Sequence, residues 1–555
     1  MNIAFWIMIS AWFFVLIWVP FIIYTNRKLH PKALFVLFFA EMWERFSYYG
    51  MRALLTLYMV KELFDHLDQG QADKEALGIY GSYTAMVYLF PVIGGIIADK
   101  ILGFRKAILF GGILMMAGHF ALALEGMFFG GNMQLFFMSL TLIIIGNGFF
   151  KPNISSFLGK FYGLNDSRKD GAFTIFYMGV NIGALLSIVT CSYVADEIGW
   201  HYGFGLAGLG MLLGLLVFWF FGPISFGNKG RNPSSYDISE EIDEEKELAR
   251  LKLSKQDRKQ LDQLELDKED FQIYTSPKLK RNQILTILGT ILFVPLCAQF
   301  LNLSDIVTGI LLTLSIGILL VLLFMSFKQD TLPGKQRIWV IMVLFVFHAV
   351  FWALFEQAGG SITLFTERNV LRAGIPAPTF QFFNSLFIIL LAPLFSWLWI
   401  KMRNSGKEPS TPMKFVLGLF FLALGFAVIV LGAEYFAIEG MVSMGFLIAM
   451  YFFHTTGELC LSPVGLSMIT KLSPARAVGF VMGAWFLSIS LANKMAGLIG
   501  ELTAKNDTGE AALPTETLSV YSNTYLVWGV LVVLGSALIL LLMVPKLRTW
   551  MHGIH

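Results

Sequence analysis

The amino-acid sequence predicts an all-α polytopic membrane protein built mainly from two six-helix bundles. Three observations support this prediction: the composition, the number of long apolar stretches, and a polar segment that divides these stretches near mid-chain. Of the 555 residues, 56% are hydrophobic and only 14% are charged, whereas soluble domains average about 25% charged residues. Mean hydropathy is +0.67. The net charge of +3 is too small to indicate a nucleic-acid partner.

Fifteen apolar stretches are long enough to cross a bilayer as helices of about 17–25 residues. They show no alternation with a period of two, which excludes a membrane-spanning barrel. The stretches lie near residues 3–23, 33–60, 77–98, 106–124, 133–159, 171–195, 203–226, 283–301, 305–327, 338–365, 378–400, 413–433, 443–470, 476–500 and 521–545.

One long polar segment, residues 228–282, separates these stretches into two sets. Its mixed charges and helix-forming residues indicate a cytoplasmic, partly helical connector. We therefore expect an additional N-terminal transmembrane helix in 1–30, an N-terminal six-helix bundle in 31–226, a cytoplasmic charged linker in 227–282, two extra helices in 283–327, a C-terminal six-helix bundle in 338–545 and a cytoplasmic tail in 546–555.

The charges of the short loops orient the predicted bundle. Loops such as "TNRKLHPK" and "DKILGFRK" are rich in Lys and Arg, and the alternate loops are acidic or nearly uncharged. By the positive-inside rule the basic loops are cytoplasmic, so the N-terminus is expected outside and the C-terminus inside. Only "TERNVLRAG", with Arg368 and Arg372, contradicts this assignment. The first stretch has basic residues after it rather than before it, and no small-residue cleavage site, which favours an uncleaved anchor over a signal peptide.

The second stretch carries charges where a lipid-facing helix could not tolerate them, in "FFAEMWERFSYYGMRALLTLYM" (38–59). At about 100° per residue, five of its polar side chains share an arc of about 100°, and Tyr49 lies at the edge of that arc. The five are Glu41, Glu44, Arg45, Tyr48 and Arg52. Such a stripe must face the bundle interior or water. A purely structural ladder of ion pairs is the alternative interpretation.

Other predicted spans contain few charged side chains. Lys151 lies in "GNGFFKPNISSF", Glu356 in "FWALFEQAGGS" and Glu458 in "FHTTGELCLSPVGLS", with Ser462 one turn further on the same face. With the stripe they make four carboxylates and three cations, one negative charge in excess, which a single proton would neutralise. A buried carboxylate that loses a cationic partner gains proton affinity, so breaking an ion pair can be coupled to proton uptake.

Several uncharged residues could complete a polar cavity with aromatic walls. These are Tyr88, Asn181, Asn384 and Trp485, although each alone is more typical of helix packing. The intramembrane His119, His348 and His454 are interpreted as packed or hydrogen-bonded residues. Cys191, Cys297 and Cys460 lie in apolar runs without metal-ligand spacing, so no metal site or cofactor is expected.

The motifs resemble those of the proton-dependent oligopeptide transporter family, a branch of the major facilitator superfamily. "EMWERFSYYGMRA" resembles its E-x-x-E-R-F-x-Y-Y signature, and "GGIIADKILGFRK" resembles the D-x-x-x-G-x-R loop of the superfamily. "GFFKPNIS", "FYMGVNIGA", "FWALFEQ" and "GELCLSPVGLS" are similar to other signatures of the family, so the resemblance covers about residues 33–545. The two extra spans are similar to a pair found in bacterial members, but the leading span departs from the usual plan.

The resemblance implies a role for each motif residue. It implies a substrate site formed by Arg45, Tyr48, Tyr49, Arg52, Tyr88, Lys151, Asn181, Glu356, Asn384, Glu458, Ser462 and Trp485. Within it the cations would attract a peptide carboxylate, Glu356 would bind the peptide ammonium, the asparagines would bind the termini or backbone amides, and the aromatic residues would line side-chain pockets. The implied proton-coupling residues are Glu41, Glu44, Arg45 and Glu356. The implied gating residues are Asp99, Arg105, Arg52, Lys151 and Glu458, with Arg52–Glu356 and Lys151–Glu458 as pairs that break and re-form.

The sequence and the resemblance together predict a proton-coupled importer of di- and tripeptides in a bacterial inner membrane, with the proton as coupling ion and lipids as surroundings. Phe355 replaces the first carboxyl of a Glu-Glu pair that is common in the family, so Glu356 would act alone. Transport of another small solute, such as an amino-acid conjugate, nitrate or a drug, is the alternative within the same fold. A membrane enzyme, a channel or a receptor would be a different class, and no G-x-x-x-x-G-K-[ST] loop indicates coupling to ATP.

Overall fold

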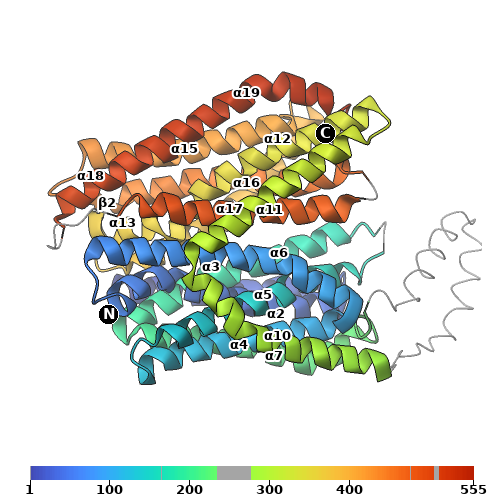
Figure 1. Ribbon diagram of the computed structural model, residues 1–555, viewed down its shortest axis with the longest axis horizontal. Helices are drawn as coiled ribbons and strands as arrows, with labels where there is room; N and C mark the ends of the chain where they lie inside the picture. Colours follow the sequence, from blue (N-terminus) through green and yellow to red (C-terminus); the bar gives the residue numbers. More distant parts are fainter. Residues whose placement is uncertain (1, 164–165, 234–276, 475–476, 505–511, 555) are drawn as a thin grey trace, which may run out of the picture.

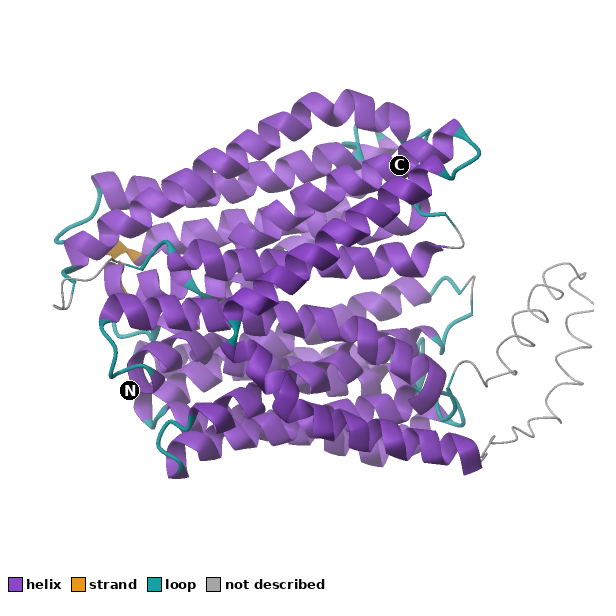
Figure 2. Ribbon diagram, in the orientation of Figure 1, coloured by secondary structure: helices purple, strands orange, loops and turns teal. Residues whose placement is uncertain are grey.

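The protein is described here by a computed structural model that covers residues 2–163, 166–233, 277–474, 477–504 and 512–554. Nearly all of the described chain is helical (Figure 1, Figure 2). The first part comprises α1 (Ile3–Asn26), α2 (Lys32–Tyr58), α3 (Gln69–Ile97), α4 (Phe104–Phe128), α5 (Met133–Gly159), α6 (Lys169–Glu197) and α7 (Trp200–Phe226). We call α2–α7 the N half; it forms the lower, blue-to-green layer of Figure 1.

The second part begins with the hairpin α10 (Pro277–Asn302) and α11 (Ser304–Phe327). The C half follows and forms the upper, yellow-to-red layer of Figure 1. It comprises α12 (Leu332–Phe355), α13 (Ser361–Asn369), α14 (Phe382–Asn404), α15 (Thr411–Tyr435), α16 (Met444–Leu472), α17 (Val478–Glu501), α18 (Pro514–Thr524) and α19 (Val533–Trp550). The π-helical segment Tyr525–Val532 joins α18 to α19. Two short strands, β1 (Val370–Leu371) and β2 (Val442–Ser443), pair in parallel.

The helices reproduce the predicted membrane spans. Fourteen helical spans in the described chain are long and apolar enough to cross a membrane. The charged α2 is not one of the fourteen and makes the fifteenth expected span. Most residues of α2 are buried by neighbouring helices, so its stripe does not face lipid. This explains how the helix tolerates four charges, each of which would cost roughly 3 kcal/mol at the centre of a bilayer.

Glycines allow two pairs of helices to pack unusually closely near the candidate site. A Cβ on Gly183 of α6 would lie 2.1 Å from the Met42 carbonyl oxygen of α2. A Cβ on Gly81 of α3 would lie 2.8 Å from the Gly497 Cα of α17. Only glycine permits both approaches. The first packs α6 against the charged helix, and the second makes a tight crossing between the two halves.

The predicted span 338–365 is not one continuous helix. It is interrupted where α12 ends at Phe355, and a 3-10 turn follows over Glu356–Gly359. Gly360, with a backbone φ of −110° and ψ of −107°, separates this turn from α13. The adjacent glycines explain the break, because glycine adopts backbone conformations that other residues avoid. The break places Glu356 at the end of a helix instead of in its interior.

The hairpin α10–α11 lies across both halves on the near face of Figure 1. Lys106 of α4 donates to Gln283 Oε1 of α10 at 2.6 Å, and Gln283 Nε2 donates to the Ile101 carbonyl oxygen at 2.8 Å. The first extra span was expected near 283–301, whereas α10, as far as it is described, already includes the basic residues of "PKLKRN" from Pro277. Long basic side chains at a helix end can extend their charges into water, which allows the helix to continue beyond the apolar stretch. Most of the predicted linker 227–282, with its expected helical content, lies outside the described residues.

The leading helix α1 packs against the N half. Its Trp12 Nε1 donates to Thr190 Oγ1 of α6 at 2.9 Å. Asn2, the N-cap of α1, donates its Nδ2–H to Glu197 Oε1 at the end of the same helix, at 2.5 Å. The additional span is therefore attached along α6.

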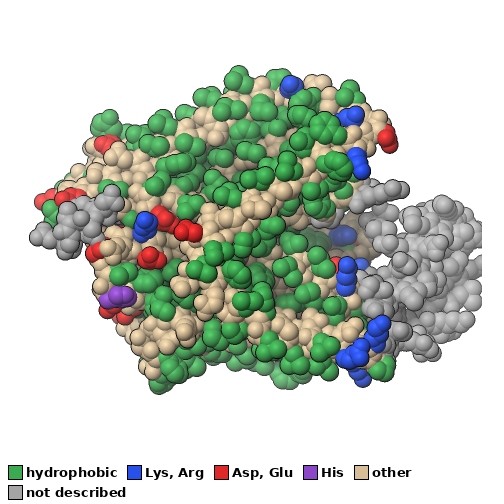
Figure 3. All heavy atoms as spheres, in the orientation of Figure 1, with side chains coloured by type: hydrophobic (Ala, Val, Ile, Leu, Met, Phe, Trp, Pro, Cys, Tyr) green, Lys and Arg blue, Asp and Glu red, His purple; other side chains and the backbone are tan. Residues whose placement is uncertain are grey.

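Charged side chains gather at opposite ends of the molecule. On the face shown in Figure 3, Lys and Arg lie mainly at the right-hand end, and Asp, Glu and His mainly at the left-hand end. We call the end that carries the loops 59–68, 129–132, 370–376 and 436–443 the acidic end, and the end that carries the loops 27–31, 98–103 and 405–410 the basic end. The chain begins near the acidic end and finishes near the basic end (Figure 1).

Candidate functional site

The charged stripe of α2 forms a compact cluster inside the N half. Arg45 Nε lies 2.7 Å from Glu41 Oε1 and 3.1 Å from Glu44 Oε2. Asn147 of α5 donates its Nδ2–H to Glu44 Oε1 at 3.1 Å. Glu41, Glu44 and Arg45 are 3%, 0% and 4% exposed. Because one guanidinium lies between two carboxylates, the ionised cluster has one negative charge in excess, and one bound proton neutralises it.

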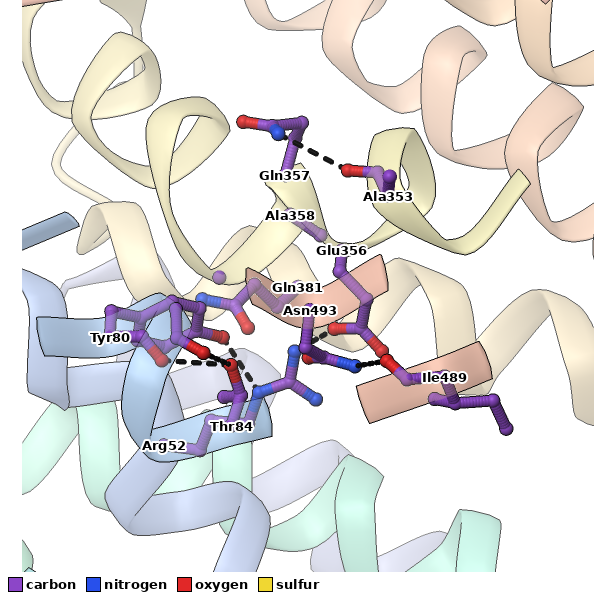
Figure 4. A network of polar contacts seen from close by, with 12 residues as sticks. Arg52, Tyr80, Thr84, Ala353, Glu356, Gln357, Ala358, Gln381, Ile489 and Asn493 are labelled. Carbon is purple, nitrogen blue, oxygen red and sulfur yellow. Dashed lines mark hydrogen bonds and ion pairs between the residues drawn. The ribbon is translucent and has the colours of Figure 1, made fainter. Parts of the chain in front are cut away.

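A second ion pair joins the two halves. Arg52 of α2 pairs through Nη2 with Glu356 Oε2, at the break after α12, and donates from Nε to the Tyr80 hydroxyl of α3 at 2.7 Å (Figure 4). Thr56, one turn further along α2, donates to the Gly359 carbonyl oxygen at 2.7 Å. The break in the predicted span thus brings Glu356 to Arg52. Sequence reasoning predicted this pair, and the structure brings both residues together.

The other predicted cross-half pair, Lys151–Glu458, is not formed. The ammonium of Lys151 in α5 lies 4.3 Å from the centroid of the Tyr88 ring. Glu458 of α16 instead accepts a hydrogen bond from Asn384 Nδ2 of α14 at 2.9 Å, and the same amide donates to Thr455 Oγ1 at 3.1 Å. The structure therefore has one candidate gating pair closed and the other open.

The polar contacts between the halves lie towards the acidic end. Besides Arg52–Glu356, they join the π-helical segment Met59–Leu63 and α3 of the N half to α13 and α17 of the C half. Those nearest the acidic end are Lys61–Glu367 at 2.5 Å, Arg368–Asp73, and Lys494 Nζ to Ser82 Oγ at 2.9 Å. One further contact, from Ser490 Oγ to the Ala85 carbonyl oxygen at 2.6 Å, lies near the middle of α3 and α17. The two halves are therefore in contact near the acidic end. Lys151 and Glu458 lie nearer the basic end than Arg52 and Glu356 do, which agrees with their separation in this arrangement.

The same contacts explain the loop whose charges contradicted the positive-inside pattern. Arg368 pairs with Asp73, which is 2% exposed, and also donates to the Tyr521 hydroxyl at 3.3 Å. Arg372 lies 3.2 Å from Glu367. Both arginines of "TERNVLRAG" are therefore paired with carboxylates at the acidic end, where Glu367 also pairs with Lys61.

The predicted lining residues of the N half occupy α2, α3 and α6. The rings of Tyr48 and Tyr49 lie 5.3 Å apart. Tyr48 is buried, and its hydroxyl has no hydrogen-bond partner among the described residues. Tyr49 and Tyr88 remain partly exposed. Asn181 is 5% exposed and donates to the Tyr177 carbonyl oxygen of its own helix at 3.1 Å, so its amide is engaged within α6.

Trp485 of α17 lies within the C half and is 4% exposed, so it is not an open wall of the site in this arrangement. It stacks on His348 with ring centroids 3.9 Å apart. The His348 ring also accepts a hydrogen bond from Trp352 Nε1 at 2.8 Å and contacts Ser488 Oγ through Nδ1 at 2.7 Å. The hydrogen-bonded interpretation of His348 is thereby confirmed. The side chain of Ser462 lies outside the described part of the chain.

The two other intramembrane histidines are also engaged. His119 Nε2 lies 2.8 Å from Ser47 Oγ. The ring of His454 packs on Phe426 with centroids 4.7 Å apart. Both agree with the interpretation of packed or hydrogen-bonded residues.

The predicted gating loop lies at the basic end, away from the charged cluster. Arg105 donates from Nε to the Lys229 carbonyl oxygen at 2.7 Å and from Nη2 to the Gly227 carbonyl oxygen at 2.6 Å. It therefore holds the segment that follows α7. Asp99 lies exposed in the π-helical turn Ala98–Leu102.

Sequence reasoning missed three residues of the polar network: Tyr80, Asn147 and Lys494. Tyr80 and Asn147 lie in apolar stretches, where such residues are usually interpreted as packing groups. Lys494 gave a detectable signal, since it is a cation within the predicted span 476–500. Its ammonium also donates to Ser304 Oγ at 2.5 Å, so it joins both halves to the start of α11.

Comparison with known proteins matches both the motifs and the fold. The family model described as POT family matches residues 105–238 and 284–516. The chain is 34% identical over 534 residues to "Peptide transporter YePEPT" of Yersinia enterocolitica, covering 94% of this chain and 95% of that protein. It is 31% identical over 530 residues to "Dipeptide and tripeptide permease B" of Salmonella typhimurium, covering 94% and 97%.

Solved structures agree. A crystal structure of a peptide transporter POT in complex with sulfate aligns with a TM-score of 0.74 at 32% identity, covering 94% of this chain and 96% of that one. A POT family transporter in complex with 5-aminolevulinic acid aligns with a TM-score of 0.72 at 30% identity, covering 93% and 97%. The predicted major facilitator-type fold is confirmed, and the chain belongs to the POT family of membrane transporters.

Proposed function

We propose that the chain is a proton-coupled symporter that imports di- and tripeptides by alternating access. The observation that carries the proposal is the Arg52–Glu356 pair between the halves, close to a cluster in which two carboxylates share Arg45. A pair that holds the halves together and a cluster that can accept a proton are the two elements that coupled transport requires.

The distribution of charge supports a zwitterionic substrate. The N half presents Arg45, Arg52 and Lys151, and the C half presents Glu356 and Glu458. A short peptide with a free carboxylate and a free ammonium can bridge these opposed charges. Arginine suits the carboxylate because it can donate two parallel hydrogen bonds, and Lys151 adds a point charge. The naming of a Salmonella relative as a dipeptide and tripeptide permease supports the same substrate class.

Proton coupling is assigned to Glu41 and Glu44. When the carboxylate of a peptide takes over hydrogen bonds of Arg45, one of these glutamates loses part of its cationic partner. A buried carboxylate in that position binds a proton more tightly. Peptide binding and proton uptake therefore favour each other, and no cofactor other than the proton is required.

In the conformational step of transport, one gating pair breaks while the other forms. In the observed arrangement Arg52–Glu356 is closed and Lys151–Glu458 is open. When the halves rock, the first pair separates and frees Glu356 for the peptide ammonium, while the second pair forms nearer the basic end. By the positive-inside rule the basic end lies in the cytoplasm. On this proposal the N-terminus lies outside and the C-terminus inside a bacterial inner membrane, and Asp99 and Arg105 act at the cytoplasmic gate.

The proton gradient is large enough for this task. One elementary charge that crosses 100 mV releases about 2.3 kcal/mol. That energy supports roughly 50-fold accumulation of a neutral solute. Hydrolysis of ATP is therefore unnecessary for concentrative uptake.

Transport of another small zwitterion is the second candidate. A related transporter was solved in complex with 5-aminolevulinic acid, which carries an amine and a carboxylate but is not a peptide. The opposed charges would also attract the two charged ends of such a solute. An inorganic anion such as nitrate would gain nothing from Glu356 and Glu458. An enzyme is disfavoured because the polar groups lie within the spans instead of converging near one membrane surface, and because the relatives are named as a peptide transporter and a permease.

Competition binding on the purified protein tests the substrate class. Radiolabelled alanyl-alanine is bound at equilibrium and displaced by alanyl-alanyl-alanine, tetra-alanine, free alanine, 5-aminolevulinate or nitrate. Only the tripeptide among these should displace the probe effectively. Displacement by 5-aminolevulinate at lower concentrations than the tripeptide would transfer the proposal to non-peptide zwitterions. Absence of saturable alanyl-alanine binding would reject peptide transport.

A further inference from the structure

The leading helix α1 forms one wall of a groove that the transport site does not use. The groove has a volume of about 460 Å³ and lies between α1, α6 and α14. Six residues of α1 between Ile3 and Phe14 line it, together with Leu185 of α6 and four residues of α14 between Phe382 and Leu390. Apart from the hydroxyl of Ser10 and the indole N–H of Trp6, the lining side chains are apolar. The volume is within the range of about 300–1,000 Å³ that small-molecule sites have.

The groove crosses the seam between the halves. Its α1 wall is fixed to the N half, because Trp12 is hydrogen-bonded to Thr190 and Asn2 to Glu197. Its opposite wall is α14, which belongs to the C half. Since the halves must rock against each other during transport, the width of the groove should depend on the conformation of the protein.

The length and position of the groove identify its occupant. The lining residues of α1 run from Ile3 to Phe14, which is about 16 Å at about 1.5 Å per residue. The hydrocarbon core of a bilayer is about 30 Å thick, so the groove is one leaflet deep. A partner helix would bury a surface across both leaflets, whereas one acyl chain extends from a headgroup to the midplane.

The mouth of the groove also fits a lipid. Its Ile3–Phe382 end lies at the acidic end, where the Asn2–Glu197 hydrogen bond provides polar groups at the level of a headgroup. Large apolar side chains on both walls are open to their surroundings: Trp6 is 57% exposed and Leu390 is 59% exposed. In a membrane these side chains meet hydrocarbon.

We propose that this groove binds one acyl chain of a phospholipid from the leaflet at the acidic end, and that the function of α1 is to create this site. A chain that fills the groove bridges α1 and α6 of the N half to α14 of the C half. It therefore stabilises the arrangement in which the acidic end is closed.

The proposal is tested with the full-length protein in liposomes that contain a phosphatidylcholine with a diazirine near the end of one acyl chain. After illumination, the labelled peptides are mapped by mass spectrometry. Labels should concentrate on residues 3–14 and 382–390. Leu386→Trp, which fills the groove, should reduce this labelling about tenfold, as expected for a loss of about 1.4 kcal/mol in binding.

Leu394→Trp is the matched control. Leu394 lies on the same helix, is 53% exposed and does not line the groove, so its variant should label like the wild type. Equal labelling of both variants and the wild type would show only the general lipid surroundings and would overturn the proposal. A dimer cross-linked through Ser10→Cys in vesicles would overturn it too, because a second copy of the chain would then cover the groove. Neither the photolabelling nor the cross-linking uses a transport substrate. Failure of the lipid proposal can therefore be distinguished from failure of the proposed transport function.

Discussion

The hydroxyl of Tyr80 occupies the space beside Gly359 where a larger residue would have its Cβ. A Cβ built on Gly359 would lie 1.7 Å from this oxygen. Tyr80 is thus held between Gly359 of the C half and Arg52 of the N half, whose Nε donates to it at 2.7 Å. The contact links the glycine after the helix break to the arginine that pairs with Glu356.

Gly359→Ala should therefore open the acidic end. The added methyl displaces the Tyr80 hydroxyl and removes a support of Arg52, and overpacking of this kind costs typically 1–3 kcal/mol. Spin labels on loops 59–68 and 370–376 should show a longer separation in the variant. Gly483→Ala is the control, because its added Cβ meets no atom within 4 Å. Unchanged separations in Gly359→Ala would contradict the role given to Tyr80.

Glu356→Gln should weaken the binding of peptides with a free amine much more than that of N-acetylated peptides. The substitution removes the charge that meets the ammonium but keeps the size of the side chain. A loss of about tenfold or more is expected for free-amine peptides, since a charged hydrogen bond contributes about 1.5–3 kcal/mol. Dissociation constants of both peptide types give the comparison. Equal losses for both types would remove the ammonium role from Glu356.

Glu44→Gln should abolish concentrative uptake while peptide counterflow remains measurable. The amide cannot take up the proton that neutralises the Glu41–Arg45–Glu44 cluster, but the cavity keeps its shape. Glu125→Gln is the matched control, because Glu125 is also a fully buried carboxylate of the N half, bonded to the Tyr58 hydroxyl at 2.7 Å and remote from the cluster. Intact accumulation by Glu44→Gln would refute the coupling assignment.

The two gating pairs should report opposite conformations. Cysteines in place of Arg52 and Glu356 should be bridged by a bifunctional thiol reagent about as long as the two lost side chains, and cysteines in place of Lys151 and Glu458 should not. With Arg52, Glu356, Lys151 and Glu458 all intact, spin labels on the loops 98–103 and 405–410 should approach each other during turnover with a peptide and a proton gradient, as the basic end closes. If both pairs cross-linked fully without substrate, the halves would not alternate as proposed.

Much of the fold was predictable because membrane spans have a strong local signal. Length and hydropathy gave the helices, and the 3.6-residue period placed the charges of α2 on one stripe. The break after Phe355 was harder to predict, because Gly359 and Gly360 lie in a stretch that is otherwise apolar enough to continue. That residues 277–282 continue directly into the extra span was not expected, because they belong to the polar segment in composition but to α10 in structure.

The site was predictable where a charge stood out against its surroundings. Arg52 and Glu356 are rare within spans, and the family resemblance suggested that they pair. Tyr80 gave no such signal, since its partner lies 28 positions away on another helix and only packing brings the two together. The burial of Trp485 against His348 also depends on how α12 and α17 pack, which no single helix pattern reveals.

Uptake into liposomes driven by an imposed pH gradient tests the central claim most directly. Purified protein is reconstituted, and accumulation of labelled alanyl-alanine is followed with acid outside, with no gradient, and with the gradient collapsed by a protonophore. Accumulation above the external concentration is expected only with acid outside, and addition of protonophore should release it. Peptide entry at the same rate and to the same level under all three conditions would contradict proton-coupled transport.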